Sequence, residues 1–291
     1  MERDKPIIGI VIMIVAMAFF ATKDGYAKII VADVPPLQLI WLQFLFTFLI
    51  IGLATVPRYG WRCLIPTPFG LQIFRGLASF LVVVTLYWSL VYIPLADASA
   101  MVLISPIIVT ALSPLLLKEK IGFRRFSAVL IGFIGVIIIL RPGFRGNIEG
   151  YLIGLLSGIF SALNYLGNRR LRSFHPPLVN IAHSVLIGIV FFAPIIPLIW
   201  EPIPQEQNMN FVPFLALSLI AHSLLVTAFI FGPASAIAPF QHSLIIFATI
   251  VGAVLFGVLP DSLTWFGISL IVGAGVYIAV REQVISNRTK G

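Results

Sequence analysis

The sequence has few charged residues and almost no cysteine. Charged side chains make up only 10% of its 291 residues, whereas 59% of the residues are hydrophobic. This composition excludes an ordinary soluble domain. The single cysteine, Cys63, cannot form a disulfide within the chain. The sequence also lacks a His-Glu-x-x-His motif, a phosphate-binding loop and paired carboxylates on one helical face, so it carries no enzyme signature.

The sequence consists mainly of long apolar runs, and its mean hydropathy is +1.06. A helix needs roughly 20 apolar residues to cross about 30 Å of hydrocarbon, and continuous runs exclude the alternating strands of a barrel. The sequence therefore predicts an all-α membrane protein with ten transmembrane helices. We expect the spans at Pro6–Ile30, Leu37–Val56, Leu71–Val91, Leu95–Leu117, Phe123–Leu140, Gly150–Leu171, Leu178–Ile199, Phe211–Phe231, Ser235–Leu259 and Leu263–Val280.

The net charge of +8 does not indicate a nucleic-acid partner, because the basic residues lie in short runs between apolar segments. If both termini are cytoplasmic, 15 of the 19 lysines and arginines fall on the cytoplasmic side and three on the outer side, with Lys23 inside a span. This asymmetry follows the positive-inside rule. We therefore expect an inner-membrane protein with cytoplasmic termini and with Cys63 in a cytoplasmic loop.

The second half of the chain repeats the first at a nearly constant offset. Gly9 matches Gly150 and residues 35–37 match residues 176–178, both at a shift of 141, while residues 135–136 match residues 275–276 at a shift of 140. The sequence predicts two repeats, residues 1–143 and 144–291. Five spans in each repeat is an odd number, so the repeats must insert in opposite orientations, which is an architecture of secondary transporters.

Polar residues within apolar spans mark candidate functional positions, because they are costly in lipid. Lys23 and Asp24 are adjacent in the first span. Neighbours on a helix point about 100° apart, so we expect these two not to pair simply along the helix, and at least one to face a cavity. The alternative is an interfacial pair with Lys23 reaching the headgroups. Their repeat counterparts, Asn164 and Tyr165, are also polar, and Asn168 follows one turn later.

Three histidines, His183, His222 and His242, lie within spans of the second half, beside Gln241. They either pack with hydrogen bonds or line a polar cavity, where their ordinary pKa range would suit proton coupling. No spacing of His, Cys or Asp favours a metal site.

Tyr87 and Trp88 fit either an aromatic belt or a stacking surface for a planar ligand. Gln43 and Ser105 complete the candidate cavity residues, since a buried amide without a partner costs about 1–3 kcal/mol. Prolines interrupt two spans that correspond in the repeats and predict kinks that could act as gates. These candidate gating prolines are Pro106, Pro114 and Pro239.

At five motifs the chain resembles a bacterial drug/metabolite transporter built from two EamA domains. The motifs are residues 20–28 (FATKDGYAK), 92–98 (YIPLADA), 117–121 (LKEKI), 232–241 (GPASAIAPFQ) and 259–261 (LPD). The resemblance covers nearly the whole chain. It implies ten spans, a central cavity and rocking between inward-facing and outward-facing states. Members often have an apolar residue where Lys23 stands and an arginine where Gln43 stands, so Lys23 is expected to take over that positive charge.

This resemblance implies a carrier for a small polar or zwitterionic metabolite, such as an amino acid or a derivative, and no cofactor. The alternative carrier would take up a larger cofactor-like compound such as riboflavin or S-adenosylmethionine, stacked on Trp88 or Tyr87. A membrane-embedded enzyme and a purely structural scaffold are the competing classes. Import or export, proton coupling or facilitation, and monomer or dimer all fit the sequence.

Overall fold

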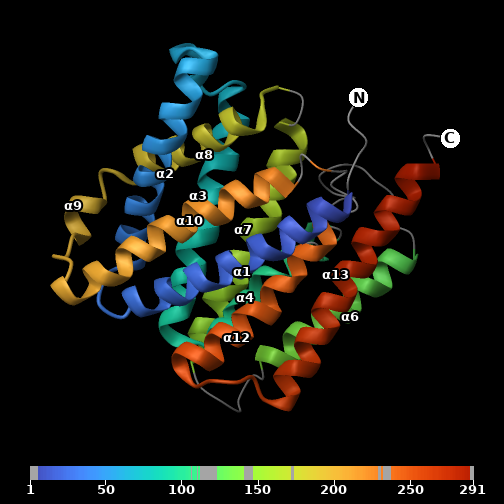
Figure 1. The fold of residues 1–291 in the computed structure, drawn as a ribbon. Coiled ribbons are helices and arrows are strands. Elements are labelled where there is room, and N and C mark those ends of the chain that lie inside the picture. Colours follow the sequence, from blue (N-terminus) through green and yellow to red (C-terminus); the bar gives the residue numbers. More distant parts are fainter. Residues whose placement is uncertain are drawn as a thin grey trace.

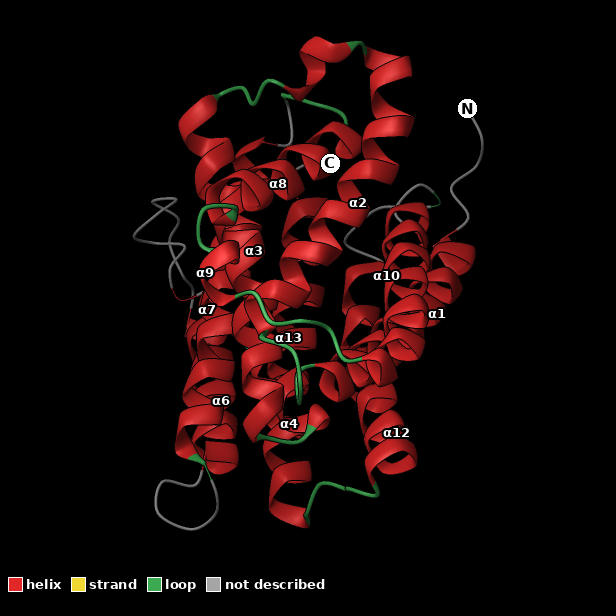
Figure 2. Ribbon diagram, turned by 90° about the vertical axis from the view of Figure 1, so that its left-hand side faces the viewer, coloured by secondary structure: helices red, strands yellow, loops and turns green. Residues whose placement is uncertain are grey.

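The computed structural model describes residues 6–105, 107–109, 111, 123–140, 147–171, 174–228, 231 and 237–288 (Figure 1). These residues form helices and loops, and Figure 2 shows no strand among them. The predicted all-α fold is therefore confirmed. The α-helices are α1 (Pro6–Ile30), α2 (Pro36–Tyr59), α3 (Phe69–Tyr92), α4 (Leu95–Val102), α6 (Phe123–Leu140), α7 (Ile148–Leu171), α8 (Pro177–Phe192), α9 (Ile196–Ile199), α10 (Asn208–Ala228), α12 (Leu244–Phe256) and α13 (Ser262–Arg288). Three short 3-10 helices are η1 (Trp61–Leu64), η2 (Gln205–Gln207) and η3 (Ala238–Ser243).

Five helical segments in the described part of the chain are long and apolar enough to cross a membrane. They are Ile7–Ile30, Pro36–Tyr59, Phe69–Tyr92, Ile148–Asn168 and Gln205–Leu225. Five shorter apolar helices of 10–17 residues lie at the other expected spans. The protein is thus an integral membrane protein, while the count of ten complete spans stays a prediction.

Proline and glycine set several helix boundaries in the way their backbones require. The second helix of each half begins at the second proline of a Pro-Pro pair, Pro36 in α2 and Pro177 in α8. Proline suits this first helical position because its missing N–H group would have no partner there. At its other end, α12 stops at Gly257, whose φ of 64° is the left-handed conformation of a helix C-cap.

The expected span at 178–199 is not one continuous helix. It divides into α8 and α9, with a turn at residues 193–195. The cause is Pro194, which has no N–H group to donate to the helical hydrogen-bond ladder, although the backbone at Ala193 keeps helical angles.

The spans with the candidate gating prolines also differ from simple helices. The expected ninth span opens with the 3-10 helix η3, which contains Pro239, before α12 begins. In the expected fourth span, α4 ends at Val102. Pro106 and Pro114 lie outside the described residues, so their role as kinks stays a prediction.

Helices pair in a pattern that repeats when the two halves are exchanged. Helix α3 of the first half packs against α7 of the second half, and the equivalent contact joins α10 of the second half to α1 of the first. The packing of α1 on α12 likewise corresponds to that of α7 on α4. Further contacts join equivalent helices, α2 to α8, α4 to α12 and α6 to α13, the last pair lying side by side in Figure 1. This is the pattern that an approximate two-fold axis between two repeats produces. One contact departs from this symmetry, because α3 packs on α8 more extensively than its counterpart α10 packs on α2.

Contacts along α3 show that the two repeats run in opposite directions. The side chain of Lys28, near the end of α1, reaches the backbone of Leu90 near the end of α3. The start of α7 lies at that same end, because Gly150 packs against Tyr92, and Gly167 near the end of α7 packs against Arg75. The first helices of the two repeats, α1 and α7, are therefore antiparallel, which confirms the inverted orientation.

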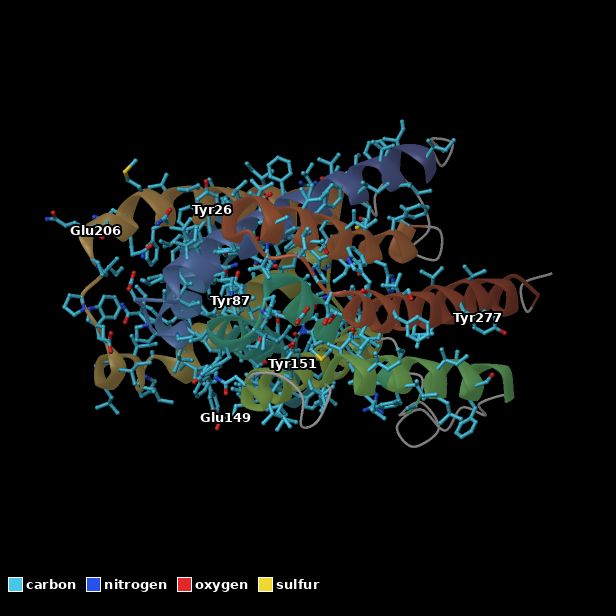
Figure 3. All side chains as sticks on the ribbon, turned by 90° about the horizontal axis from the view of Figure 1, so that it is seen from below. Tyr26, Tyr87, Glu149, Tyr151, Glu206 and Tyr277 are labelled. Atoms are coloured by element: carbon cyan, nitrogen blue, oxygen red, sulfur yellow. The ribbon has the colours of Figure 1, made fainter. Side chains whose placement is uncertain are left out.

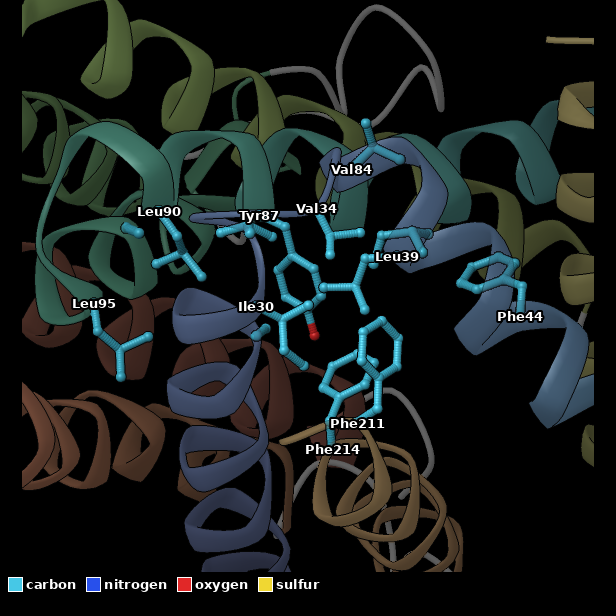
Figure 4. Close-up of a cluster of buried hydrophobic side chains, with 14 of the residues drawn as sticks. Ile30, Val34, Leu39, Phe44, Val84, Tyr87, Leu90, Leu95, Phe211 and Phe214 are labelled. Carbon is cyan, nitrogen blue, oxygen red and sulfur yellow. The ribbon is translucent and has the colours of Figure 1, made fainter. Parts of the chain in front are cut away.

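Connecting segments gather at two opposite ends of the bundle, as alternating helices require. The α2–α3 connection meets the α7–α8 connection where Thr67 hydrogen-bonds to His175. At the other end, the α1–α2 region meets the segment before α10, where Gln38 hydrogen-bonds to the backbone of Glu201. Between these ends lies an apolar core in which Figure 4 shows Tyr87 among Ile30, Leu39 and Phe214.

Candidate functional site

A buried ion pair lies in the interior of the bundle, where α1 meets α3. The ammonium of Lys23 is 2.8 Å from Oδ1 of Asp24, and both side chains are buried. Lys23 also donates a hydrogen bond of 2.7 Å to the hydroxyl of Tyr87, which in turn donates one of 3.1 Å to Oδ1 of Asp24. We call these three residues the charged triad. Figure 3 places Tyr87 inside the bundle, while Glu149 and Glu206 lie at its periphery.

This arrangement corrects the expectation that Lys23 and Asp24 would not pair. The backbone directions of neighbouring residues do diverge, but a lysine side chain is long enough to bend back to the next residue. The hydroxyl of Tyr87 fixes this bent conformation because it contacts both charged groups. Because both side chains are buried, each charge needs the other as its compensating partner.

Aromatic side chains surround the triad from both halves of the protein. The ammonium of Lys23 lies 5.4 Å from the ring centroid of Phe20, within range of a cation–π attraction, and meets Tyr87 at its hydroxyl edge. From α10, His222 packs edge-on against Phe20 with ring centroids 4.8 Å apart, and Phe214 packs edge-on against Tyr87 at 6.1 Å. The triad therefore lies at the junction of α1, α3 and α10, which belong to different repeats.

A second polar cluster lies around Arg75, in the second turn of α3. Its Nη1 donates a hydrogen bond of 2.8 Å to Oδ1 of Asn168 on α7, and its Nη2 donates to the backbone carbonyl oxygen of Asn180 on α8. Asn164 donates to the carbonyl oxygen of Arg75 at 3.3 Å and accepts a bond of 2.8 Å from Asn168. Asn164 and Asn168 thus gather at Arg75, apart from the triad.

Arg75 is a residue that the sequence reasoning missed. The positive-inside count treated it as part of a cytoplasmic segment, whereas it is only 4% exposed and lies within α3. One signal could have identified it: Gln72 and Arg75 are three residues apart in an apolar helix, so they share one face. Gln72 donates a hydrogen bond of 3.1 Å to Oδ1 of Asn180, next to the guanidinium.

His183 joins this second cluster, and His222 does not. Nε2 of His183 lies 2.7 Å from the carbonyl oxygen of Cys63, and its ring packs edge-on against His175. Nδ1 of His222 contacts the carbonyl oxygen of Ser218 one turn back in α10. His242 is buried against Gly275 of α13. The histidines are thus spread over several places instead of lining a single surface.

The other candidates lie apart from both clusters. Tyr165 donates a hydrogen bond of 3.0 Å to Oε1 of Gln241, which joins α7 to η3. Gln43 and Ser105 are buried, and among the described residues neither side chain bonds to the triad. Trp88 is 49% exposed on the outside of α3, while its neighbour Tyr87 is fully buried. The two aromatic residues therefore face opposite environments.

A cavity of about 230 Å³ opens at the end of the bundle where α3 ends and α13 begins. Two of the motifs that carry the family resemblance line it, through Pro94 and Asp97 in one and Pro260 and Asp261 in the other. Tyr151 of α7 donates a hydrogen bond of 2.6 Å to Oδ2 of Asp97. The two motifs therefore line the same cavity, although they are far apart in the sequence.

No group of three or more His, Cys, Asp or Glu side chains in the described part of the chain is placed to hold a metal ion. Both clusters can bind charged and hydrogen-bonding groups, the triad in a buried environment and the Arg75 cluster beside the exposed Asn168. The triad offers one cation and one anion, and the Arg75 cluster offers a planar cation.

Comparison with known proteins shows which family this chain matches. The EamA-like transporter family matches residues 7–141 and again residues 148–281. A riboflavin transporter of Vibrio cholerae is 26% identical over 99% of this chain and 98% of its own, and the pseudopaline exporter CntI of Pseudomonas aeruginosa is 26% identical over 97% of both chains. An S-adenosylmethionine uptake transporter of Rickettsia prowazekii is 23% identical over 94% of this chain and 93% of its own.

A solved crystal structure, 21% identical, shares the fold with a TM-score of 0.63 and covers 93% of this chain and 96% of that one. The duplicated family match also agrees with the inverted halves of the bundle, and the relatives are transporters, not enzymes. The chain therefore belongs to the EamA-like transporter family of the drug/metabolite transporter superfamily.

Proposed function

We propose that the protein is an inner-membrane carrier that moves a small polar or zwitterionic metabolite, such as an amino acid or a derivative, by alternating access. The observation that carries this proposal is the buried ion pair of Lys23 and Asp24 beside Tyr87. Charged residues inside membrane helices are rare and mark substrate or ion pathways. Here the pair lies where helices of both repeats meet, which is where such carriers bind their substrates.

A zwitterion is the ligand that can replace the pairing of Lys23 with Asp24 at the lowest cost in free energy. Its carboxylate can replace Asp24 beside Lys23, and its ammonium can replace Lys23 beside Asp24, so that no charge is left alone. A neutral apolar ligand would separate Lys23 from Asp24 without compensation, and an unpaired buried charge costs about 3–5 kcal/mol. The ion pair therefore favours a ligand with charges of both signs.

Inverted repeats provide two states that mirror each other. When helices of one repeat adopt the conformation of their counterparts, the opening to the triad moves to the other side of the membrane. We place both termini in the cytoplasm, the repeat boundary between residues 143 and 144, and the gates at Pro106, Pro114 and Pro239. Protons are the proposed coupling ion, with the membrane histidines and Asp24 as the groups that could carry them.

A second candidate substrate is a larger cofactor-like metabolite. The relatives named for riboflavin and for S-adenosylmethionine favour it, since both match nearly the whole chain. In this protein a planar ring would stack on Phe20 or Tyr87, which lie beside Lys23, while the exposed Trp88 faces away from them.

Purified protein in proteoliposomes tests both candidates. Labelled amino acids, riboflavin and S-adenosylmethionine would be offered with and without a pH gradient. We expect flux of a zwitterionic compound, accelerated by the gradient, and loss of that flux in Lys23→Met. Trp88→Phe serves as the matched control for Tyr87→Phe, because Tyr87 belongs to the triad and the exposed Trp88 does not. Flux that is unchanged in Lys23→Met and Tyr87→Phe would refute the proposed site.

A further inference from the structure

The guanidinium of Arg75 is a buried cation whose hydrogen-bond partners among the described residues are neutral. The side chain is 4% exposed, and its hydrogen bonds go to the side-chain amide oxygen of Asn168 and the backbone oxygen of Asn180. Within the described part of the chain, no aspartate or glutamate lies within ion-pair distance of it. Lys23, the other buried cation near α3, has Asp24 as its counter-charge. Arg75 therefore lacks the compensation that Lys23 has.

Three buried polar atoms in this region have no hydrogen-bond partner among the described residues. They are Nε of Arg75 itself, Oε1 of Gln72, whose amide nitrogen bonds to Asn180, and Nδ1 of His183, whose ring is within electrostatic range of Arg75. Because Nε2 of His183 faces the carbonyl oxygen of Cys63, its proton belongs on Nε2, and Nδ1 is left as an acceptor. The cluster thus presents one charged donor and two acceptors that its own side chains do not use. Buried polar groups without partners are uncommon in folded proteins and call for an explanation.

We propose that Arg75, with Asn168 and Asn180 beside it, binds an oxyanion, namely the carboxylate or phosphate group of the transported metabolite. A guanidinium presents its N–H groups in a planar fork that matches the two oxygens of such a group. The free acceptors on Gln72 and His183 would bind a hydroxyl or ammonium group next to the anion. This inference rests on the proposed function and adds a second binding site for the substrate.

The position of Arg75 separates this site from the triad. Arg75 and Tyr87 are twelve positions apart in α3, which is about 18 Å at about 1.5 Å per residue. A small metabolite cannot touch both sites at once, so it would occupy them in turn. Arg75 lies towards the end of the bundle that carries Cys63 and His175, the end that we place in the cytoplasm. The second site is thus on the cytoplasmic branch of the pathway.

Thermal unfolding of the purified protein in phosphatidylcholine nanodiscs tests the anion site without a transport assay. Sodium phosphate and sodium acetate would be titrated against sodium chloride at equal ionic strength. We expect phosphate or acetate to raise Tm by about 3 °C at tenfold its Kd, relative to chloride. The two salts form separate arms, so their difference shows whether the site prefers a phosphate or a carboxylate.

Three variants assign any such shift to Arg75. Arg75→Gln should lose the shift, and Arg58→Gln, a change at an exposed arginine, should keep it. If Arg75→Gln does not fold, Asn168→Asp replaces it, because a carboxylate beside the guanidinium should raise Tm in chloride and abolish the response to added anions. The proposal is overturned if all salts shift Tm equally, or if Arg75→Gln or Asn168→Asp keeps the anion-specific shift. A protein that transports but shows no anion-specific shift overturns this inference alone, whereas a shift without transport would count against the carrier.

Discussion

The ammonium of Lys28, in the last turn of α1, lies 2.6 Å from the backbone carbonyl oxygen of Leu90, in the last turn of α3. The same ammonium donates a second hydrogen bond, of 2.7 Å, to the carbonyl oxygen of Ile93 just beyond that helix. The last carbonyl groups of a helix have no partner within it and carry partial negative charge. Lys28 therefore caps α3 from a neighbouring helix and fixes the end of α3 beside α1.

We expect Lys28→Met to lower the free energy of unfolding by about 1–3 kcal/mol, because the carbonyl groups lose a charged donor. Lys28→Arg keeps a positive donor and should recover most of the loss. Thermal unfolding in detergent measures both. Equal stability of the Met and Arg variants would show that the cap contributes nothing.

The ion pair of the triad should show strong coupling in a double-mutant cycle. Asp24→Asn leaves the ammonium of Lys23 buried without its counter-charge, and Lys23→Met leaves the carboxylate with only the Tyr87 hydroxyl. Each single change should cost about 3–5 kcal/mol, and the double variant should cost clearly less than their sum. Unfolding curves of the four proteins give the coupling energy. Additivity to within about 0.5 kcal/mol would contradict the pairing.

Close packing of α4 on α7 depends on Gly158. A Cβ at this position would collide with the backbone carbonyl oxygen of Met101 and come within 2.5 Å of Cγ2 of Ile104. A backbone atom cannot move aside as a side chain can, so Gly158→Ala should destabilise the protein by about 1–3 kcal/mol.

Gly273, within α13, is the matched control for this change. No atom lies within 4 Å of a Cβ built there, so Gly273→Ala should stabilise the helix by about 0.5–1 kcal/mol. Opposite signs for the two changes are expected in thermal unfolding. A loss of stability in both would show that the effect is not specific to the α4–α7 contact.

Cysteine labelling tests the proposed orientation in the membrane. Cys63 lies in η1, at the end that we place in the cytoplasm, and Ala32 is exposed at the opposite end. A membrane-impermeant maleimide should label Cys63 only in permeabilised cells. In a Cys63→Ser background, Ala32→Cys should be labelled in intact cells. The reverse result would place the termini outside.

Much of this fold could be predicted from the sequence, because each membrane helix can be recognised from its own apolar run without knowledge of its neighbours. Apolar runs located the helices, and the match of residues 35–37 with residues 176–178 revealed the repeat. Five spans per repeat then required the inversion that the contacts of α3 with α1 and α7 confirm. The break at Pro194 was missed, since a proline inside an apolar run can either kink a helix or end it.

The contacts within the candidate site were harder to predict. Lys23, Asp24 and Tyr87 stood out as polar groups in apolar segments, but their hydrogen bonds depend on how α3 is rotated against α1. That rotation is set by packing among many side chains, including the glycines at which helices approach closely. Arg75 was overlooked for a related reason: near a span boundary, the same residue can reach the headgroups or turn inward.

Helix α3 contributes a residue to both polar clusters, since Arg75 and Tyr87 are part of this one continuous helix. A stiff rod that rocks about its midpoint swings its two tips in opposite directions. A tilt of α3 that moves Arg75 away from Asn168 and Asn180 would move Tyr87 towards Lys23 and Asp24. A tilt in the opposite direction would reverse both changes. If α3 moves in this way during transport, the two ends of the pathway would open in turn and never together.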